Sequence, residues 1–147
     1  MASGVVHHST LVGELKSEHR ELLATFGLLR HAAEERDAAG FRRALAAFKA
    51  LLVPHLVKES FKVYTYLRQE YKAKGDLAVY DMVTAYKSEM TGIGDTALRF
   101  VESCDQMADD AIDFVQIDAT LHTMGRLLGD RIRREEAELY PLYQTTH

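Results

Sequence analysis

The sequence predicts an all-α fold, an antiparallel four-helix bundle with up-down-up-down topology. Apolar residues recur with the spacing of a helix along nearly the whole chain of 147 residues. The chain contains two prolines and nine glycines, which is too few for the many turns of a β-sandwich or β-barrel. Three short breaks separate four long segments, and short connections place consecutive helices of a bundle side by side and antiparallel.

The first two segments lie in the N-terminal half of the chain. The first is expected from about residue 10 to residue 35, with Ser9 or Thr10 as its N-cap. An Asp-Ala-Ala-Gly run then separates two apolar patterns and forms the first break. The second segment is expected over residues 41–72. It contains Pro54, which removes a backbone donor, so we expect a kink there.

The other two segments follow a Lys-Gly-Asp break. The third covers about residues 77–103, and Gly92 and Gly94 weaken it by about 1 kcal/mol each relative to alanine. A break over residues 105–110 precedes the fourth segment. We expect this last helix to end at the Tyr-Pro pair that contains Pro141, because proline disfavours helix before and after it.

Composition limits the class of protein. The length fits a single domain, expected over residues 10–147, preceded by a flexible N-terminal arm over residues 1–9. A net charge of −4 argues against a nucleic-acid partner. No targeting segment and no apolar run of about 18 residues is visible, so we expect a cytoplasmic protein without membrane contact. The single cysteine, Cys104, excludes a disulfide framework and a multi-cysteine metal site.

Ionisable residues interrupt the apolar faces of the predicted helices. Burying such side chains is costly unless they are paired or bind a metal ion. The residues in question are His19, His55, Glu59, Arg131 and Glu135.

Four of these residues predict a metal site. His55 and Glu59 are four positions apart, so both side chains leave the helix on the same face. Glu135 adds a carboxylate from the fourth helix and His19 an imidazole from the first, and facing helices of a bundle bring such groups together. This set of ligands suits iron, manganese or zinc. Tyr86 also faces inward, and its phenolate is a further candidate ligand for a ferric ion.

The motifs around these residues resemble the hemerythrin-like (HHE cation-binding) family. They are Glu-His-Arg-Glu-Leu-Leu around His19, His-Leu-Val-Lys-Glu from His55 to Glu59, and the closing Arg-Arg-Glu-Glu-Ala-Glu-Leu-Tyr-Pro-Leu-Tyr. The resemblance covers about residues 10–143. The family pattern is a histidine on helix 1, HxxxE on helix 2, a histidine on helix 3 and HxxxE on helix 4. It implies a bundle with an oxo- or hydroxo-bridged di-iron centre that binds oxygen or related small molecules.

This sequence departs from the family pattern at two positions. Met90 stands where the third helix often carries histidine, and Arg131 replaces the histidine of the second HxxxE motif. The resemblance therefore implies one iron ion, or an altered pair, held by His19, His55, Glu59 and Glu135. In the alternative reading, the guanidinium of Arg131 takes the place of the second metal, neutralises the carboxylates and leaves a bundle without metal.

Two functions remain open at this stage. The resemblance implies a metalloprotein that senses oxygen, nitric oxide or peroxide, or that handles iron. The alternative is a metal-free module that acts through protein–protein contacts. The sequence contains no nucleophile–base pattern, phosphate-binding loop or dinucleotide fingerprint, so a non-enzymatic role is favoured over a peroxide-consuming enzyme. The sequence names no protein partner and allows a homo-oligomer.

Overall fold

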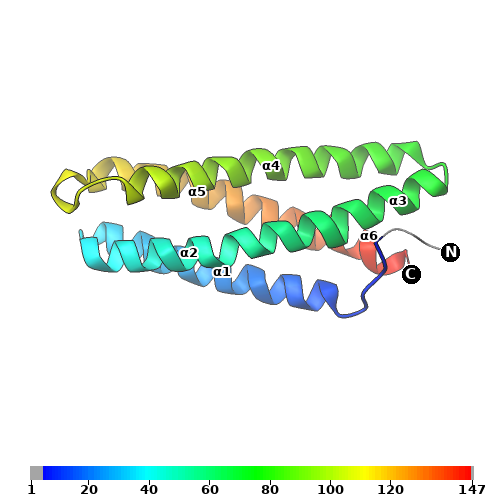
Figure 1. The fold of residues 1–147 in the computed structure, drawn as a ribbon, viewed down its shortest axis with the longest axis horizontal. Helices are drawn as coiled ribbons and strands as arrows, with labels where there is room; N and C mark the ends of the chain where they lie inside the picture. The colour runs from blue at the N-terminus through cyan, green and yellow to red at the C-terminus, as the bar shows by residue number, and fades with distance from the viewer. Residues whose placement is uncertain (1–4, 147) are drawn as a thin grey trace.

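The computed structural model describes residues 5–146, which fold into four long helical rods and contain no strand. Figure 1 shows the rods running along the long axis of the molecule in alternating directions, with both termini at one end. The all-α bundle predicted from the sequence is confirmed. The elements are α1 (Leu11–Glu34), α2 (Ala38–Glu59), η1 (Ser60–Tyr64), α3 (Thr65–Ala73), α4 (Leu77–Asp105), η2 (Asp109–Ala111), α5 (Phe114–Arg134), η3 (Glu135–Leu139) and α6 (Tyr140–Thr145).

Aspartates begin three of the helices. Asp37, Asp76 and Asp113 each accept a hydrogen bond from a backbone N–H of the first turn, as N-caps do. With Asp37 as its N-cap, α2 begins at Ala38, three residues before the predicted start at Phe41. Thr10 also occupies an N-cap position, but its side chain makes no capping bond, so the predicted cap is only positional. Its backbone is αR, whereas Asp37 has the extended backbone that N-caps usually adopt.

The second and fourth rods each contain one turn of π-helix, η1 and η3. Helix α2 continues through Pro54, and the departure from α-helical bonding comes six residues later, at Ser60. The predicted end of the fourth rod at Pro141 is wrong, because α6 continues to Thr145. Pro141 lies in the first turn of α6, where a missing N–H is tolerated.

Two apolar clusters fill the bundle, one at each end. The first is at the end of the bundle distant from the termini and is built around aromatic residues that include Phe26, Phe41 and Phe48. The second is nearer the termini and includes Tyr66 and Tyr143. Along the rods, the buried ionisable residues lie between the residues of the two clusters. The polar layer is therefore enclosed by apolar packing at both ends.

The described part of the predicted N-terminal arm packs on the bundle. The ring of His7 stacks on that of Tyr143 with centroids 4.5 Å apart, and the backbone N–H of His8 donates to the Tyr143 hydroxyl at 2.8 Å. The remainder of the arm, residues 1–4, lies outside the described residues.

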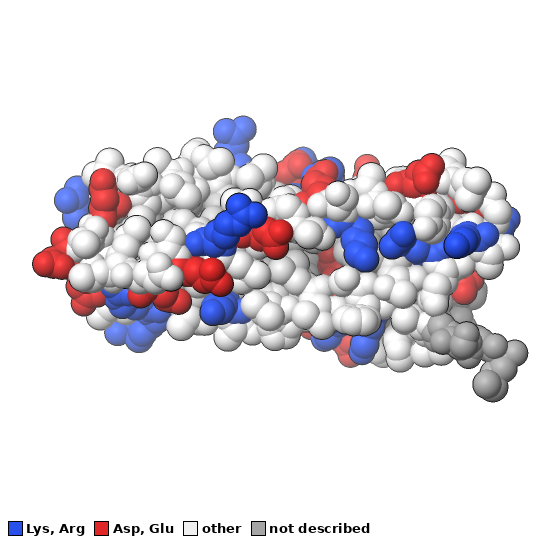
Figure 2. Space-filling view, turned by 45° about the horizontal axis from the view of Figure 1, so that its top comes forward, with Lys and Arg blue, Asp and Glu red and all other residues white. Residues whose placement is uncertain are grey.

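The surface mixes both signs of charge. On the face shown in Figure 2, basic and acidic side chains are scattered among wide uncharged areas. Among the described helices, none is long and apolar enough to cross a membrane.

Candidate metal centre

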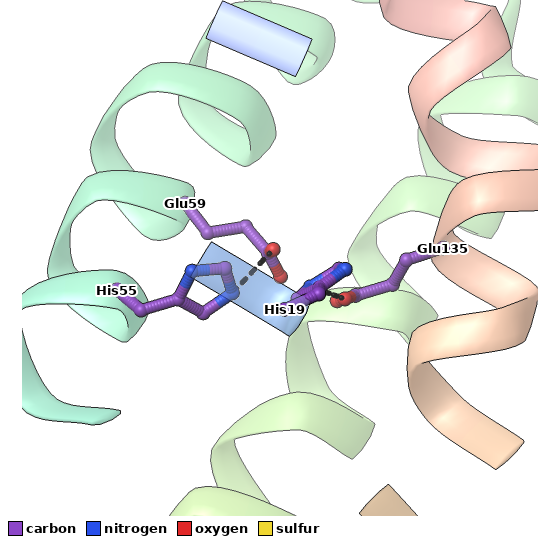
Figure 3. A group of neighbouring side chains, drawn as sticks. All are labelled: His19, His55, Glu59 and Glu135. Atoms are coloured by element: carbon purple, nitrogen blue, oxygen red, sulfur yellow. Dashed lines mark ion pairs between the residues drawn. The ribbon is translucent and has the colours of Figure 1, made fainter. Parts of the chain in front are cut away.

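The four predicted ligands meet in the interior of the bundle (Figure 3). His19 comes from α1, His55 and Glu59 from the end of α2, and Glu135 from the start of η3. One ligand atom from each residue lies within 4.8 Å of all the others. All four side chains are buried, with at most 4% of the residue surface exposed. The predicted convergence of these residues is confirmed.

Both histidines are oriented by carboxylates outside the cluster. Nδ1 of His55 donates to Glu18 and Nδ1 of His19 donates to Glu136, each at 2.8 Å. The Nε2 atoms then face inward, 3.3 Å from Oε2 of Glu59 and 3.1 Å from Oε1 of Glu135. A neutral imidazole that donates through Nδ1 has only a lone pair on Nε2. A lone pair opposite a carboxylate oxygen requires a proton or a metal ion between the two atoms.

The two carboxylates bridge two sides of the centre. Oε2 of Glu59 and Oε1 of Glu135 face the histidines, which we call the histidine side. The opposite oxygens, Oε1 of Glu59 and Oε2 of Glu135, accept hydrogen bonds from the Tyr64 hydroxyl at 2.9 and 3.1 Å. Arg131 lies there too, so we call this the arginine side. Each carboxylate thus has one oxygen on each side.

Arg131 is the cation of the arginine side and is only 1% exposed. Its Nε donates to Oε2 of Glu135 at 3.1 Å, so the contact predicted from the sequence is present. The guanidinium also donates to the Tyr64 hydroxyl and, at 3.4 Å, to Glu89. Burial acts to lower the pKa of Arg131, but the neighbouring Tyr64 and Glu135 outweigh it and raise that pKa. The guanidinium therefore stays charged.

Tyr86 does not join the four ligands. Its hydroxyl donates to Glu138, and its ring lies 4.5 Å from the guanidinium carbon of Arg131. The structure thus places Tyr86 beside the arginine side, as a cation–π partner of Arg131 rather than as a member of the cluster.

Sequence reasoning overlooked two tyrosines whose hydroxyls do reach the cluster. The Tyr64 hydroxyl bonds both carboxylates, and the Tyr140 hydroxyl donates to Oε2 of Glu59 at 2.6 Å and lies 3.1 Å from Nε2 of His19. A repeated spacing in the sequence was the available signal. Residues 55–64 and 131–140 both read as a basic residue or histidine, glutamate four positions later and tyrosine five positions after that.

The two π turns explain how this spacing works. Thr65 N–H bonds to the Ser60 carbonyl, and Tyr140 N–H bonds to the Glu135 carbonyl, each an i→i+5 bond. In an α-helix, a residue five positions after a glutamate points well away from it. The wider π turn brings that residue back toward the same face, and such turns are frequent at functional sites.

The two buried carboxylates behave differently toward protons. Burial acts to raise the pKa of Glu59, but hydrogen bonds from Glu135, His55 and Tyr140 outweigh it and lower that pKa. Burial and the charge of Glu59 raise the pKa of Glu135 well above its ordinary value. Without a metal ion, two carboxyl groups this close and this deeply buried therefore bind a proton more tightly as a pair than either group would alone.

A pocket of about 270 Å³ lies between α2–η1 and α4. Tyr64 and Met90 belong to its lining, together with the exposed Phe61 and with Leu56 and Lys87. Tyr64 is thus shared between the pocket lining and the hydrogen bonds of the arginine side.

Comparison with known families agrees with this geometry. Residues 10–143 match the Hemerythrin HHE cation binding domain, which is more than nine-tenths of the chain. The comparisons with curated proteins and with solved structures give no match. The family match spans all four rods and contains every residue of the buried cluster. The chain therefore belongs to the hemerythrin HHE cation-binding domain family.

Proposed function

We propose that this protein is a hemerythrin-like metalloprotein that holds a single iron ion between His19, His55, Glu59 and Glu135. One observation carries the proposal: both imidazoles turn Nε2 inward because carboxylates hold their Nδ1 atoms from outside. Histidines that bind metal ions are usually held in this way, since the outer bond fixes the ring and makes the inner nitrogen more basic.

The donor set fits the metal that the family implies. Two imidazole nitrogens and two carboxylates suit iron, and they also suit manganese and zinc. Iron in such a site would supply reversible binding of oxygen, nitric oxide or peroxide. The chain contributes two oriented histidines, two buried carboxylates and an apolar surrounding that limits water. The pocket beside Tyr64 and Met90 offers a small molecule a path toward the centre. A role in sensing such a molecule, or in iron handling, is consistent with these features.

The arginine side supports one ion rather than two. Each carboxylate already has a partner for its second oxygen, since Tyr64 donates to both and Arg131 donates to Glu135. A second metal ion placed there would meet a buried, permanent positive charge. Replacing Arg131 with histidine would remove this charge and restore an HxxxE motif, so we expect Arg131→His to raise metal uptake.

Elemental analysis tests the proposal directly. Protein purified without a polyhistidine tag and without added metal is expected to contain close to one iron per chain. The double variant His19→Ala/His55→Ala should contain far less, whereas His122→Ala, which removes an exposed histidine, should not differ from wild type. Two irons in every wild-type chain would contradict the role given to Arg131.

A metal-free interaction module is the second candidate. The buried pairing of Arg131 with Glu135 favours it, because this cation can neutralise the centre without iron. Under this alternative, the purified protein would contain no stoichiometric metal. It would also keep its helicity and unfolding midpoint in the presence of a strong chelator.

A further inference from the structure

We propose that Tyr140 is a fifth ligand, a phenolate, and that the centre therefore selects ferric iron over divalent ions. This inference rests on the proposed metal site and deepens it, because it assigns a residue and an oxidation state that the four-residue cluster leaves open.

The distances within the cluster support a fifth ligand. Two ligands at right angles on an ion, each about 2.1 Å from it, are about 3.0 Å apart. The Tyr140 oxygen lies 2.6 Å from Oε2 of Glu59 and 3.1 Å from Nε2 of His19. Oε2 of Glu59 lies in turn 3.3 Å from Nε2 of His55, and Nε2 of His19 lies 3.1 Å from Oε1 of Glu135. Neighbouring atoms in this series lie 2.6–3.3 Å apart, the distance of a hydrogen bond, so the five atoms are close enough to bind one ion when it replaces the protons between them.

The surroundings of Tyr140 fix its hydroxyl at this point. The residue is fully buried, and its ring lies nearly parallel to that of His19, with centroids 5.5 Å apart. Its hydroxyl contacts two atoms of the cluster, Nε2 of His19 and Oε2 of Glu59. The π turn η3 ends at Leu139, directly before Tyr140, and the bond from Tyr140 N–H to the Glu135 carbonyl closes this turn and sets the direction of the side chain.

Tyr64 is the internal control for this assignment. It follows Glu59 by five positions, as Tyr140 follows Glu135, and it also donates to Glu59. Its bond goes to the other oxygen, Oε1, on the arginine side, and the guanidinium of Arg131 donates to its hydroxyl. A phenol beside a buried guanidinium is poorly placed to bind a cation. The two tyrosines therefore differ in the side of the carboxylates that they face.

The chemistry of a phenolate gives the expected selectivity. It is a hard, anionic oxygen ligand, which favours a small trivalent ion over a divalent one, and tyrosine is known as a ligand of ferric iron. On coordination, the bond between oxygen and hydrogen of Tyr140 is replaced by a bond between oxygen and iron, and the proton passes to solvent. A bound cation makes such deprotonation favourable, as it does for thiols and water.

Optical spectroscopy of ferric-loaded protein tests the assignment. Tag-free protein, freed of metal and reloaded with ferric citrate, is expected to show a tyrosinate-to-iron charge-transfer band in the visible range. Resonance Raman excitation in this band should enhance tyrosinate ring vibrations. We expect Tyr140→Phe to lose the band and Tyr64→Phe to keep it. The affinity for ferric iron should fall in Tyr140→Phe by more than the roughly 10–100-fold loss typical of a lost outer hydrogen bond. Affinity for Mn²⁺ should change less.

The possible outcomes distinguish a failure of the Tyr140 assignment from a failure of the proposed metal site. Bound iron without tyrosinate vibrations in the wild type, or a band that Tyr64→Phe removes, would overturn the assignment while leaving the metal site intact. These two readouts do not depend on the folding of Tyr140→Phe, which circular dichroism checks separately. A band that persists in folded Tyr140→Phe would also overturn it. Absence of iron from every sample by elemental analysis would overturn both the inference and the proposed function.

Discussion

The two sides of the buried centre satisfy the same pair of carboxylates with different chemistry. On the histidine side, Glu59 and Glu135 face two imidazoles, which are neutral or charged depending on protons and metal. On the arginine side, they face Tyr64 and the permanently charged Arg131. The comparison shows that the same two carboxylates contact imidazoles through one oxygen each and a phenol, with a fixed cation beside it, through the other.

One outer contact is repeated on the two sides. Glu18 on α1 contacts both His55 and Lys58 of the second rod. Glu89 on α4 contacts both Arg131 and Arg134 of the fourth rod. In each case the two residues that the glutamate contacts are three positions apart, His55 and Lys58 in one rod and Arg131 and Arg134 in the other. The contacts of Glu18 and Glu89 therefore form an approximate repeat. Despite this repeated contact, the inner residues differ, with histidine on one side and arginine on the other.

The largest expected effect comes from removing the fixed cation. In metal-free protein, Arg131→Met should lower the free energy of unfolding by about 3–5 kcal/mol, because it leaves buried carboxylates without a partner charge. The matched control is Arg134→Met, which removes a more exposed guanidinium that also contacts Glu89 and should cost about 1 kcal/mol or less. Denaturant unfolding in chelator measures both changes. Equal losses in the two variants would show that Arg131 carries no special charge balance.

The next largest effect is expected in the iron affinity of variants at the two outer carboxylates, Glu18 and Glu89. Glu18→Gln weakens the bond that orients His55, so the affinity for iron should fall by about 10–100-fold. Glu89→Gln changes the equivalent position on the arginine side and should leave iron affinity within about twofold of wild type, because the proposed single ion would contact only the histidine side. Competition with a chelator of known affinity measures both variants. Similar losses in both would indicate that metal also occupies the arginine side.

The smallest effect is the pH dependence of the histidine side. Burial acts to lower the pKa of His55, but its bonds to Glu59 and Glu18 outweigh this and raise it above 6.5. The folded protein thus binds this proton more tightly than the unfolded chain does. The stability from His55 is fully present below pH 6.5 and is lost as the pH rises through the raised pKa.

A thermal or denaturant series across pH checks this sign in metal-free protein. The difference in unfolding free energy between wild type and His55→Gln should be larger at low pH and shrink as the pH rises. The difference between wild type and Arg134→Met should stay nearly constant over the same range, because a guanidinium does not titrate there. A His55 difference that grows with pH would contradict the assignment.

Periodicity explains why the sequence predicts much of this centre. His19, His55, Glu59 and Glu135 occupy positions where helical spacing requires apolar residues, so their burial and their common level in the bundle follow from a regular 3.6-residue repeat. Tyr140 and Tyr64 escape this reasoning, because a π turn changes the repeat locally.

The remaining differences also have local causes. Tyr86 faces inward as predicted, but its position on α4 places it beside Arg131 and Glu138. A helical repeat predicts that a side chain faces inward, but it does not predict which side of the buried carboxylates a phenol will face. The helix beyond Pro141 was unexpected because the preceding π turn, which the repeat does not show, lets α6 begin at Tyr140 and places the proline in its first turn.

The π turns also determine where the chain tolerates changes in length. An α-helix rotates by about 100° per residue, so inserting one further residue between Glu59 and Tyr64 would turn the Tyr64 side chain away from Glu59. The same holds for an insertion between Glu135 and Tyr140. The connection between α4 and α5, residues 106–113, lies at the far end of the bundle and has no such constraint. In this chain, the register of two rods is therefore part of the geometry of the buried cluster, and natural insertions and deletions are expected at the connections between rods instead.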